Sequence, residues 1–257
     1  MNDPKVWDLA SVRHLVGGAD PRRRKIRRQW RRLDEAVCTR TVQDGIFQGM
    51  LLTGGATGSD IPKRLGSYEQ ELHPILEQTI PYDTVLDVGC GEGFYVVGLA
   101  RLWPRADVHG FDISLDAQEQ CRDMAEANGV KISVHGATSA LDLGRFVSGR
   151  TLIVCDAEGA EAEVLDPELA PELAKADLLV ELHEFMVPGV TGLIMSRFSE
   201  HQAVHICQER RDRSAYPLLN SLTDGDANRA LDESRPESQE WLWLTRAPKS
   251  EDANTGS

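Results

Sequence analysis

The fold of this chain is decided by residues 85–93, which read VLDVGCGEG. An apolar run that changes abruptly into closely spaced glycines is typical of a buried parallel strand followed by a tight turn and a helix. Residues 84–88 predict the strand, and residues 94–102 predict the helix. Glycine suits the turn because it adopts backbone conformations that a side chain forbids and lets a ligand approach the main chain. The stretch therefore predicts a nucleoside-cofactor site at the end of a strand.

Strand and helix patterns alternate from this stretch to the C-terminal region. Seven apolar segments predict strands, near residues 84–88, 107–112, 131–135, 151–155, 177–183, 202–207 and 241–245. Helical patterns lie between most of them, and such alternation predicts a mainly parallel sheet with right-handed crossovers. We therefore expect an α/β, Rossmann-like, doubly wound and mostly parallel seven-stranded sheet with helices on both faces, preceded by an N-terminal helical extension.

The glycine stretch resembles a known motif. Asp87 followed by Gly-x-Gly-x-Gly is similar to the first motif of class I S-adenosylmethionine-dependent methyltransferases, whereas dinucleotide proteins carry Gly-x-Gly-x-x-Gly. The resemblance implies that Gly89 and Gly91 pass close to the methionine part of the cofactor and that Asp87 receives its ammonium group. It also implies that Asp112, at the end of the next apolar run, binds both ribose hydroxyls. The remaining cofactor residues implied by the resemblance are Tyr68, Cys90, Gly93, Ile113 and Ala137.

A narrower resemblance lies downstream. Residues 156–161 (DAEGAE) and 181–184 (ELHE) resemble the FkbM-type branch of that superfamily, and residues 65–72 (LGSYEQEL) are similar to a segment in some relatives of that branch. Together these segments cover roughly residues 63 to 208. Ala157 departs from the branch, which usually has a β-branched residue there. The resemblance implies a late antiparallel strand near residues 241–245.

These patterns predict three parts of the chain. Residues 1–62 are expected to form a helical extension with a glycine-rich loop, acting as a cap or lid, residues 63–247 the methyltransferase domain, and residues 248–257 a disordered tail. Helices are expected over 5–16 and 22–40 in the extension, and one over 68–78 starts with Ser67 and Gln70 spaced as a capping box.

Candidate catalytic residues follow from a rule of doubly wound sheets, which place their chemistry at the carboxyl ends of the strands. Asp156 ends the fourth predicted strand, and Glu181 and His183 end the fifth, two residues apart and so on one face if the strand continues that far. An alcohol acceptor must lose its proton during methyl transfer, and His183 is the first choice for the base, with Asp156 orienting it. With Glu158 and Glu181, the same residues are also candidate ligands for Mg²⁺ or Mn²⁺. The alternatives are acids that stabilise a helix N-terminus and an imidazole hydrogen-bonded beneath a loop.

The charge of the chain is unevenly distributed. The formal net charge is −13, yet eight of the 28 basic residues lie within residues 22–32. Ile26, Trp30, Leu33 and Val37 recur there at helical spacing, which favours an amphipathic helix with solvated arginines. These arginines would also suit an acceptor that carries phosphate or carboxylate. The five cysteines form no Cys-x-x-Cys pair, and we expect Cys90 and Cys155 to be buried.

Function is expected to follow the resemblance. The first expectation is O-methylation of a hydroxyl on a small molecule, such as a sugar or a natural-product intermediate, by a cytoplasmic protein without a membrane partner. No apolar run approaches the roughly 18 residues of a membrane span. One alternative is N-methylation, or RNA methylation through the basic helix, although an acidic pocket would repel nucleic acid. The other is a non-catalytic module that only binds the cofactor.

Overall fold

The computed structural model describes residues 21–54, 59–209, 211–233, 235 and 239–246. The chain divides into two compact units. Unit 1 contains residues 1–79, 126–129 and 208–238, and unit 2 contains residues 80–125, 130–207 and 239–257. This division groups residues 63–79 and 208–238 with the N-terminal segment, whereas the sequence predicted boundaries after residues 62 and 247. The predicted helix over 5–16, most of the glycine-rich loop and the tail lie outside the described residues.

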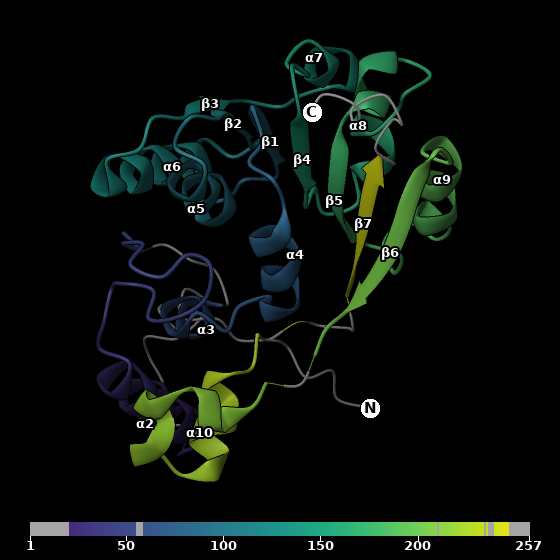
Figure 1. Cartoon of the computed structure of the whole chain (residues 1–257). Coiled ribbons are helices and arrows are strands. Elements are labelled where there is room, and N and C mark those ends of the chain that lie inside the picture. Colours follow the sequence, from purple (N-terminus) through teal and green to yellow (C-terminus); the bar gives the residue numbers. More distant parts are fainter. Residues whose placement is uncertain (1–20, 55–58, 210, 234, 236–238, 247–257) are drawn as a thin grey trace, which may run out of the picture. The chain divides into compact units, whose positions relative to one another are not determined.

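Unit 2 is built on a seven-stranded sheet with the order β3-β2-β1-β4-β5-β7-β6 (Figure 1). The strands are β1 (Thr84–Val88), β2 (Asp107–Phe111), β3 (Ser133–His135), β4 (Thr151–Cys155), β5 (Asp177–Leu182), β6 (His201–Cys207) and β7 (Glu240–Arg246). Neighbours from β3 to β5 run parallel, and β7 is antiparallel to both β5 and β6. The structure thus confirms the expected mixed, mostly parallel sheet and the late antiparallel strand.

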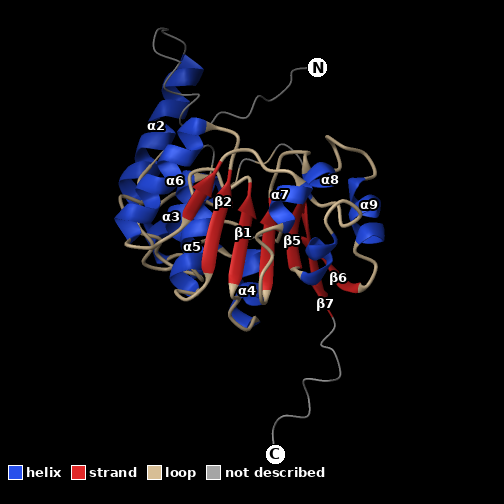
Figure 2. Cartoon of the chain, turned by 90° about the horizontal axis from the view of Figure 1, so that it is seen from above, coloured by secondary structure: helices blue, strands red, loops and turns tan. Residues whose placement is uncertain are grey.

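Helices cover both faces of this sheet (Figure 2). They are α5 (Phe94–Leu102), α6 (Leu115–Asn128), α7 (Ala140–Gly144), α8 (Glu161–Val164) and α9 (Val190–Arg197), with a 3₁₀ turn at Pro171–Lys175. One core cluster joins side chains of α7, α8 and α9 to alternate residues of the central strands, such as Leu86, Ile153 and Val180. The central strands β1, β4 and β5 are buried along their whole length, as expected for parallel strands covered on both faces.

Unit 1 is helical and has its own apolar core, which includes Leu33, Val37, Ile61 and Leu65. Its helices are α2 (Pro21–Ala36), α3 (Asp60–Leu65), α4 (His73–Gln78) and α10 (Asp224–Ala230), with short 3₁₀ turns at Gln70–Leu72, Arg213–Ala215 and Pro217–Ser221. The helix predicted over 22–40 therefore ends at Ala36. Of the described helices, none is both long and apolar enough to span a bilayer.

The capping box predicted at Ser67 is wrong. Ser67 hydrogen-bonds back to the carbonyl of Pro62, and Glu69 has left-handed backbone angles that interrupt the expected helix. The α-helix begins only at His73, where Pro74 occupies one of its first positions. Proline has no N–H to donate and is favoured in the first turn of a helix, so it marks the true start.

Unit 1 also contains a buried cluster of ion pairs, here called the ion-pair cluster. It consists of Glu69, Glu71, Arg211, Glu233 and Arg235. A guanidinium nitrogen of Arg211 lies 2.6 Å from the Glu71 carboxylate and 2.7 Å from that of Glu233. The carboxylate of Glu233 also accepts hydrogen bonds from Arg235 and from the backbone N–H of Glu69. These contacts join the segment before β1 to the segment between β6 and β7.

Candidate functional site

The glycine loop between β1 and α5 contains three glycines with positive φ, and each has a different environment. At Gly89, φ is +84° and an added Cβ would lie 1.8 Å from the carbonyl oxygen of Asp156. At Gly93, an added Cβ would lie 3.1 Å from the Cys121 sulfur. Only at Gly91, among these three, would a Cβ meet no atom within 4 Å. Gly91 is therefore the position where a ligand can approach the loop backbone, whereas Gly89 and Gly93 allow close packing within the protein.

Asp112 follows β2 directly and hydrogen-bonds to the glycine loop. Its two carboxylate oxygens accept hydrogen bonds from the backbone N–H groups of Gly91 (2.9 Å) and Ser114 (2.8 Å). Each oxygen retains a second acceptor site, so the carboxylate can still bind two hydroxyl groups. Ile113 is 85% exposed and Ala137 is exposed as well, which leaves apolar surface available beside Asp112. This arrangement is compatible with the predicted ribose contact of Asp112 and leaves Ile113 and Ala137 accessible to a ligand.

The contacts of Asp87, Cys90 and Tyr68 with a cofactor stay predictions. Asp87 is buried within β1 at 2% exposure. The Cys90 thiol is buried in the core as expected, and its hydrogen bond with Cys121 and its burial raise its pKa. Cys155 is also buried. Tyr68 belongs to unit 1, where Lys63 lies over its ring at 4.8 Å.

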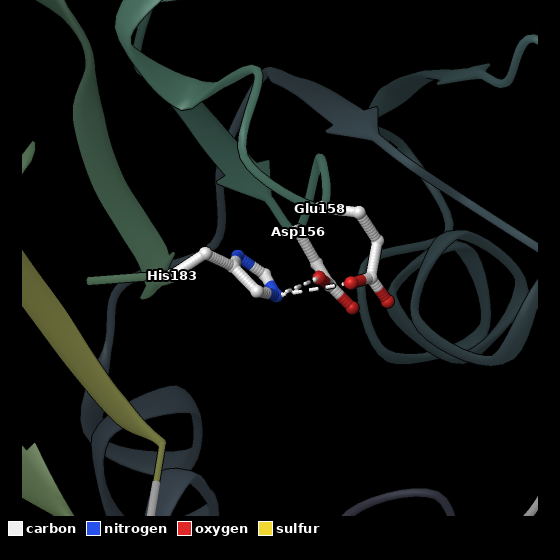
Figure 3. A group of neighbouring side chains, drawn as sticks. All are labelled: Asp156, Glu158 and His183. Carbon is white, nitrogen blue, oxygen red and sulfur yellow. Dashed lines mark ion pairs between the residues drawn. The ribbon is translucent and has the colours of Figure 1, made fainter. Parts of the chain in front are cut away.

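Two of the acids predicted at the strand ends, Asp156 and Glu158, come together with the predicted imidazole of His183 in unit 2 (Figure 3). This group, here called the histidine cluster, consists of Asp156, Glu158, Glu161 and His183. His183 Nδ1 lies 2.7 Å from a carboxylate oxygen of Glu161, and both side chains are completely buried. Nε2 lies 3.7 Å from Asp156 Oδ1 and 3.4 Å from Glu158 Oε2. Glu158 has a φ of 49°, in the left-handed region that favours glycine. Such uncommon backbone conformations in residues other than glycine are often found at functional sites.

The charges of the histidine cluster determine where its protons lie. Burial alone would lower the pKa of His183, but the carboxylates of Glu158, Glu161 and Asp156 outweigh it and raise this pKa to about 10. Burial likewise opposes ionisation of Glu161, yet His183 and the Gly159 N–H lower its pKa. Glu161 is therefore an ionised acceptor, and Nδ1 of His183 donates to it. This contact leaves Nε2 directed at the other two acids.

Glu181 is not part of this cluster. Strand β5 ends at Leu182, so the two-residue alternation that would have put Glu181 and His183 on one face does not continue to His183. Glu181 is buried in the strand, opposite Trp241 of β7. The predicted metal and catalytic set of Asp156, Glu181 and His183 thus changes, because among the described residues Glu158 completes the group of possible ligands. Glu161, the last acid of the 156–161 motif, was not predicted as the histidine partner.

The histidine cluster and the glycine loop touch each other. The backbone N–H of Asp156 donates to the carbonyl of Val88 at 2.9 Å, and the Asp156 carbonyl occupies the space that a side chain at position 89 would need. Apolar side chains border the cluster on the segment after β5. The rings of His183 and Phe185 are 5.9 Å apart, and both Phe185 and Met186 are about half exposed. Ligands at the loop and at the cluster would therefore be neighbours within unit 2.

Comparison with protein families agrees with this arrangement. Residues 85–168 match the family described as a methyltransferase domain, a segment that runs from β1 past β4. It includes the glycine loop, Asp112, and the acids of the histidine cluster, but it ends before His183. The match supports the class of S-adenosylmethionine-dependent methyltransferases for this domain. The match does not distinguish the FkbM-type branch from other branches, so membership of that branch stays a prediction.

Several solved methyltransferases are similar in structure at low sequence identity. A precorrin-6Y C5,15-methyltransferase from Geobacter metallireducens is 10% identical, with 69% of this chain and 89% of that chain covered and a TM-score of 0.48. The O-methyltransferase TomG from Streptomyces achromogenes, solved with S-adenosylmethionine, is 15% identical, with coverage of 96% and 100% and a TM-score of 0.46. An rRNA methylase from Streptococcus thermophilus is 12% identical, with coverage of 69% and 97% and a TM-score of 0.46. No curated protein matched the chain.

Proposed function

We propose that this protein is an S-adenosylmethionine-dependent methyltransferase that methylates a hydroxyl oxygen of a small molecule. The family match over residues 85–168 supports the class. The observation that carries the rest is the histidine cluster, in which three carboxylates surround a buried imidazole directly beside the glycine loop. An acceptor at the cluster would face a cofactor bound at Gly91 and Asp112.

The cofactor would bind mainly through backbone and carboxylate groups. Its methionine part would approach Gly91, where no side chain interferes, and its ribose would bind the free acceptor sites of Asp112. The exposed side chains of Ile113 and Ala137 would flank the adenine. Asp156 is in contact with the loop through Gly89, so the methyl group would be directed toward the cluster.

The reaction needs a group that accepts the hydroxyl proton. As the acceptor oxygen attacks the methyl carbon, the carbon–sulfur bond breaks and the hydroxyl proton must leave. His183 was expected to be this base because of its ordinary pKa, but its pKa is raised to about 10 and its ring is already protonated at neutral pH. We therefore propose that Asp156 or Glu158 accepts the hydroxyl proton, because these are the carboxylates that face Nε2. The charged imidazole holds these two acids in place.

Binding and turnover test this proposal separately. Calorimetry should detect S-adenosylmethionine binding, and Asp112→Ala should weaken it at least about tenfold because two charge-assisted hydrogen bonds are lost. The matched control is Asp116→Ala, since Asp116 is exposed in the first turn of the next helix. Absence of cofactor binding to the unaltered protein would contradict the proposal.

The acceptor is tested with methyl-labelled cofactor and a panel of hydroxyl-bearing and amine-bearing small molecules. We expect label on hydroxyl compounds, and Asp156→Asn should reduce turnover by about 10²- to 10⁴-fold with cofactor affinity retained. Label only on amines or RNA would overturn the O-methylation part. Tight cofactor binding without turnover on any acceptor of the panel would favour the non-catalytic module.

A further inference from the structure

We propose that Asp156, Glu158 and His183 bind a divalent cation, Mn²⁺ or Mg²⁺, through one atom each. The three ligand atoms are Nε2 of His183, a carboxylate oxygen of Asp156 and a carboxylate oxygen of Glu158, and all lie within 4.8 Å of one another (Figure 3). The cation would lie in the same part of unit 2 as the proposed acceptor. The proposal does not depend on methyl transfer, because metal binding can be measured without cofactor or acceptor.

The distances are suited to a small octahedral cation. Two ligands at right angles around an ion with bonds of about 2.1 Å are about 3.0 Å apart, and two opposite ligands are about 4.2 Å apart. Nε2 lies 3.4 Å from Glu158 Oε2 and 3.7 Å from Asp156 Oδ1, between these two limits. Small rotations of the two acidic side chains would therefore complete the coordination. Three protein ligands would leave positions for water or an acceptor oxygen.

The imidazole is oriented as a metal ligand. His183 is completely buried, and Nε2 makes no hydrogen bond with any described residue although it is directed at the two acids. Glu161 accepts from Nδ1 at 2.7 Å, and its oxygen also accepts from the Gly159 N–H at 3.0 Å. In many metal sites a carboxylate behind a histidine fixes the ring and directs the other nitrogen at the metal. Here that nitrogen is the one directed at Asp156 and Glu158. A cation bound at His183 would displace the proton from Nε2, so its affinity should rise with pH.

The charge and the exposure of the cluster support a cation. Three carboxylates surround one imidazole, so the cluster is negative even when His183 is protonated. Carboxylate oxygens together with an imidazole suit Mn²⁺, whereas Mg²⁺ prefers oxygen ligands alone. The side chain of Glu158 is 76% exposed and that of Asp156 is 32% exposed, which gives an ion a path from solvent to the buried Nε2. The ligand set thus favours Mn²⁺ over Mg²⁺.

Mn²⁺ binding tests this proposal directly. The signal of free Mn²⁺ in electron paramagnetic resonance should decrease as the full-length protein is added, with saturation at one ion per chain. Glu158→Gln should weaken Mn²⁺ binding at least tenfold, and Glu161→Gln should weaken it about 10- to 100-fold by releasing the ring of His183. Glu163→Gln is the matched control, because Glu163 is exposed in the same short helix α8 and lies outside the cluster.

The outcomes separate this proposal from the proposed function. Mn²⁺ binding that is equal in the unaltered protein and Glu158→Gln, or no binding at millimolar Mn²⁺, would overturn the metal site. Cofactor binding, measured by calorimetry on the same samples, would in that case still support the proposed methyltransferase function. Circular dichroism of each variant checks that it is folded, and addition of Mg²⁺ should release bound Mn²⁺ only at higher concentration.

Discussion

The two buried charge clusters of this protein differ in how their charges are compensated. In the ion-pair cluster of unit 1, the three carboxylates meet two guanidinium groups, and Glu233 accepts from both of them. In the histidine cluster of unit 2, three carboxylates meet a single imidazole, and Nε2 faces two acids without a hydrogen bond. Removal of one partner of a buried ion pair leaves an uncompensated charge and is strongly destabilising, whereas a buried imidazole nitrogen that faces two acids can bind a cation. The comparison predicts opposite responses to substitution, pH and metal.

The largest effect is expected from Arg211→Met. The change removes the positive charge that lies 2.6 Å from Glu71 and 2.7 Å from Glu233, and it leaves two buried carboxylates with less compensation. The free energy of unfolding, measured with urea, should fall by about 3–5 kcal/mol. Arg229→Met is the control, because the Arg229–Asp232 ion pair is partly exposed and should contribute less than about 1 kcal/mol. Equal losses in the two variants would show that the ion-pair cluster is not a stabilising element.

The pH dependence should have opposite sign in the two units. Burial, and then the charge of Arg211, lower the pKa of His73 in unit 1 to about 4. The unfolded chain binds this proton below about pH 6.5, so stability is lost as the pH falls from there through 4, by about 3 kcal/mol at most. His183 has a raised pKa of about 10, so its contribution is complete below about pH 6.5 and is lost as the pH rises through 10.

Titration of the histidine ring protons by nuclear magnetic resonance checks both pKa values in metal-free protein. His73→Gln should flatten the acid side of the stability curve and leave the alkaline side unchanged. If His183 titrated near its ordinary pKa, the carboxylates would not keep it charged at neutral pH. His183 would then again be the first candidate for the base that accepts the hydroxyl proton.

A smaller effect is expected from Mn²⁺. At a concentration of one hundred times the dissociation constant, a ligand that binds only the folded state stabilises it by about 2.7 kcal/mol. The unfolding temperature should therefore rise on addition of Mn²⁺, and the rise should vanish in Glu158→Gln but persist in Arg229→Met. Stabilisation that persists in Glu158→Gln would place the ion elsewhere in the protein.

The smallest effect is expected from Glu158→Gln without metal. The substitution removes one of three neighbouring negative charges from an exposed side chain, so the free energy of unfolding should change by less than about 1 kcal/mol in either direction. Urea denaturation with a chelator present measures this change. A loss as large as that of Arg211→Met would show that Glu158 has a structural role.

The sheet was largely predictable from the sequence, because fully buried parallel strands appear as apolar runs and the glycine stretch marks the turn after β1. The histidine cluster was predictable only in part. Asp156, Glu158 and His183 follow from the strand-end rule, whereas Glu161 meets His183 through a short helix whose orientation no periodicity reveals. Glu181 was misplaced because β5 ends one residue before His183. The raised pKa of His183 depends on the distances from its ring to three acids, and no local sequence pattern predicts these distances.

Unit 1 shows another limit of the sequence. Its ion-pair cluster connects Glu69 and Glu71 to Arg211, Glu233 and Arg235, which are more than a hundred residues away in the chain. Neither segment carries a pattern that indicates the other. The start of α4 differs from the prediction for a local reason, because Pro74 favours a helix start at His73 over one at the capping residues Ser67 and Gln70.

The contact between Gly89 and the carbonyl of Asp156 has a kinetic consequence. The Asp156 carbonyl fills the space beside Gly89, so a movement of the β1–α5 loop in a cofactor-bound state would also move the backbone that carries Asp156. The donor substrate would then shape the acceptor site before the acceptor arrives. We expect an ordered sequential mechanism in which the acceptor binds second, and product inhibition patterns would reveal it.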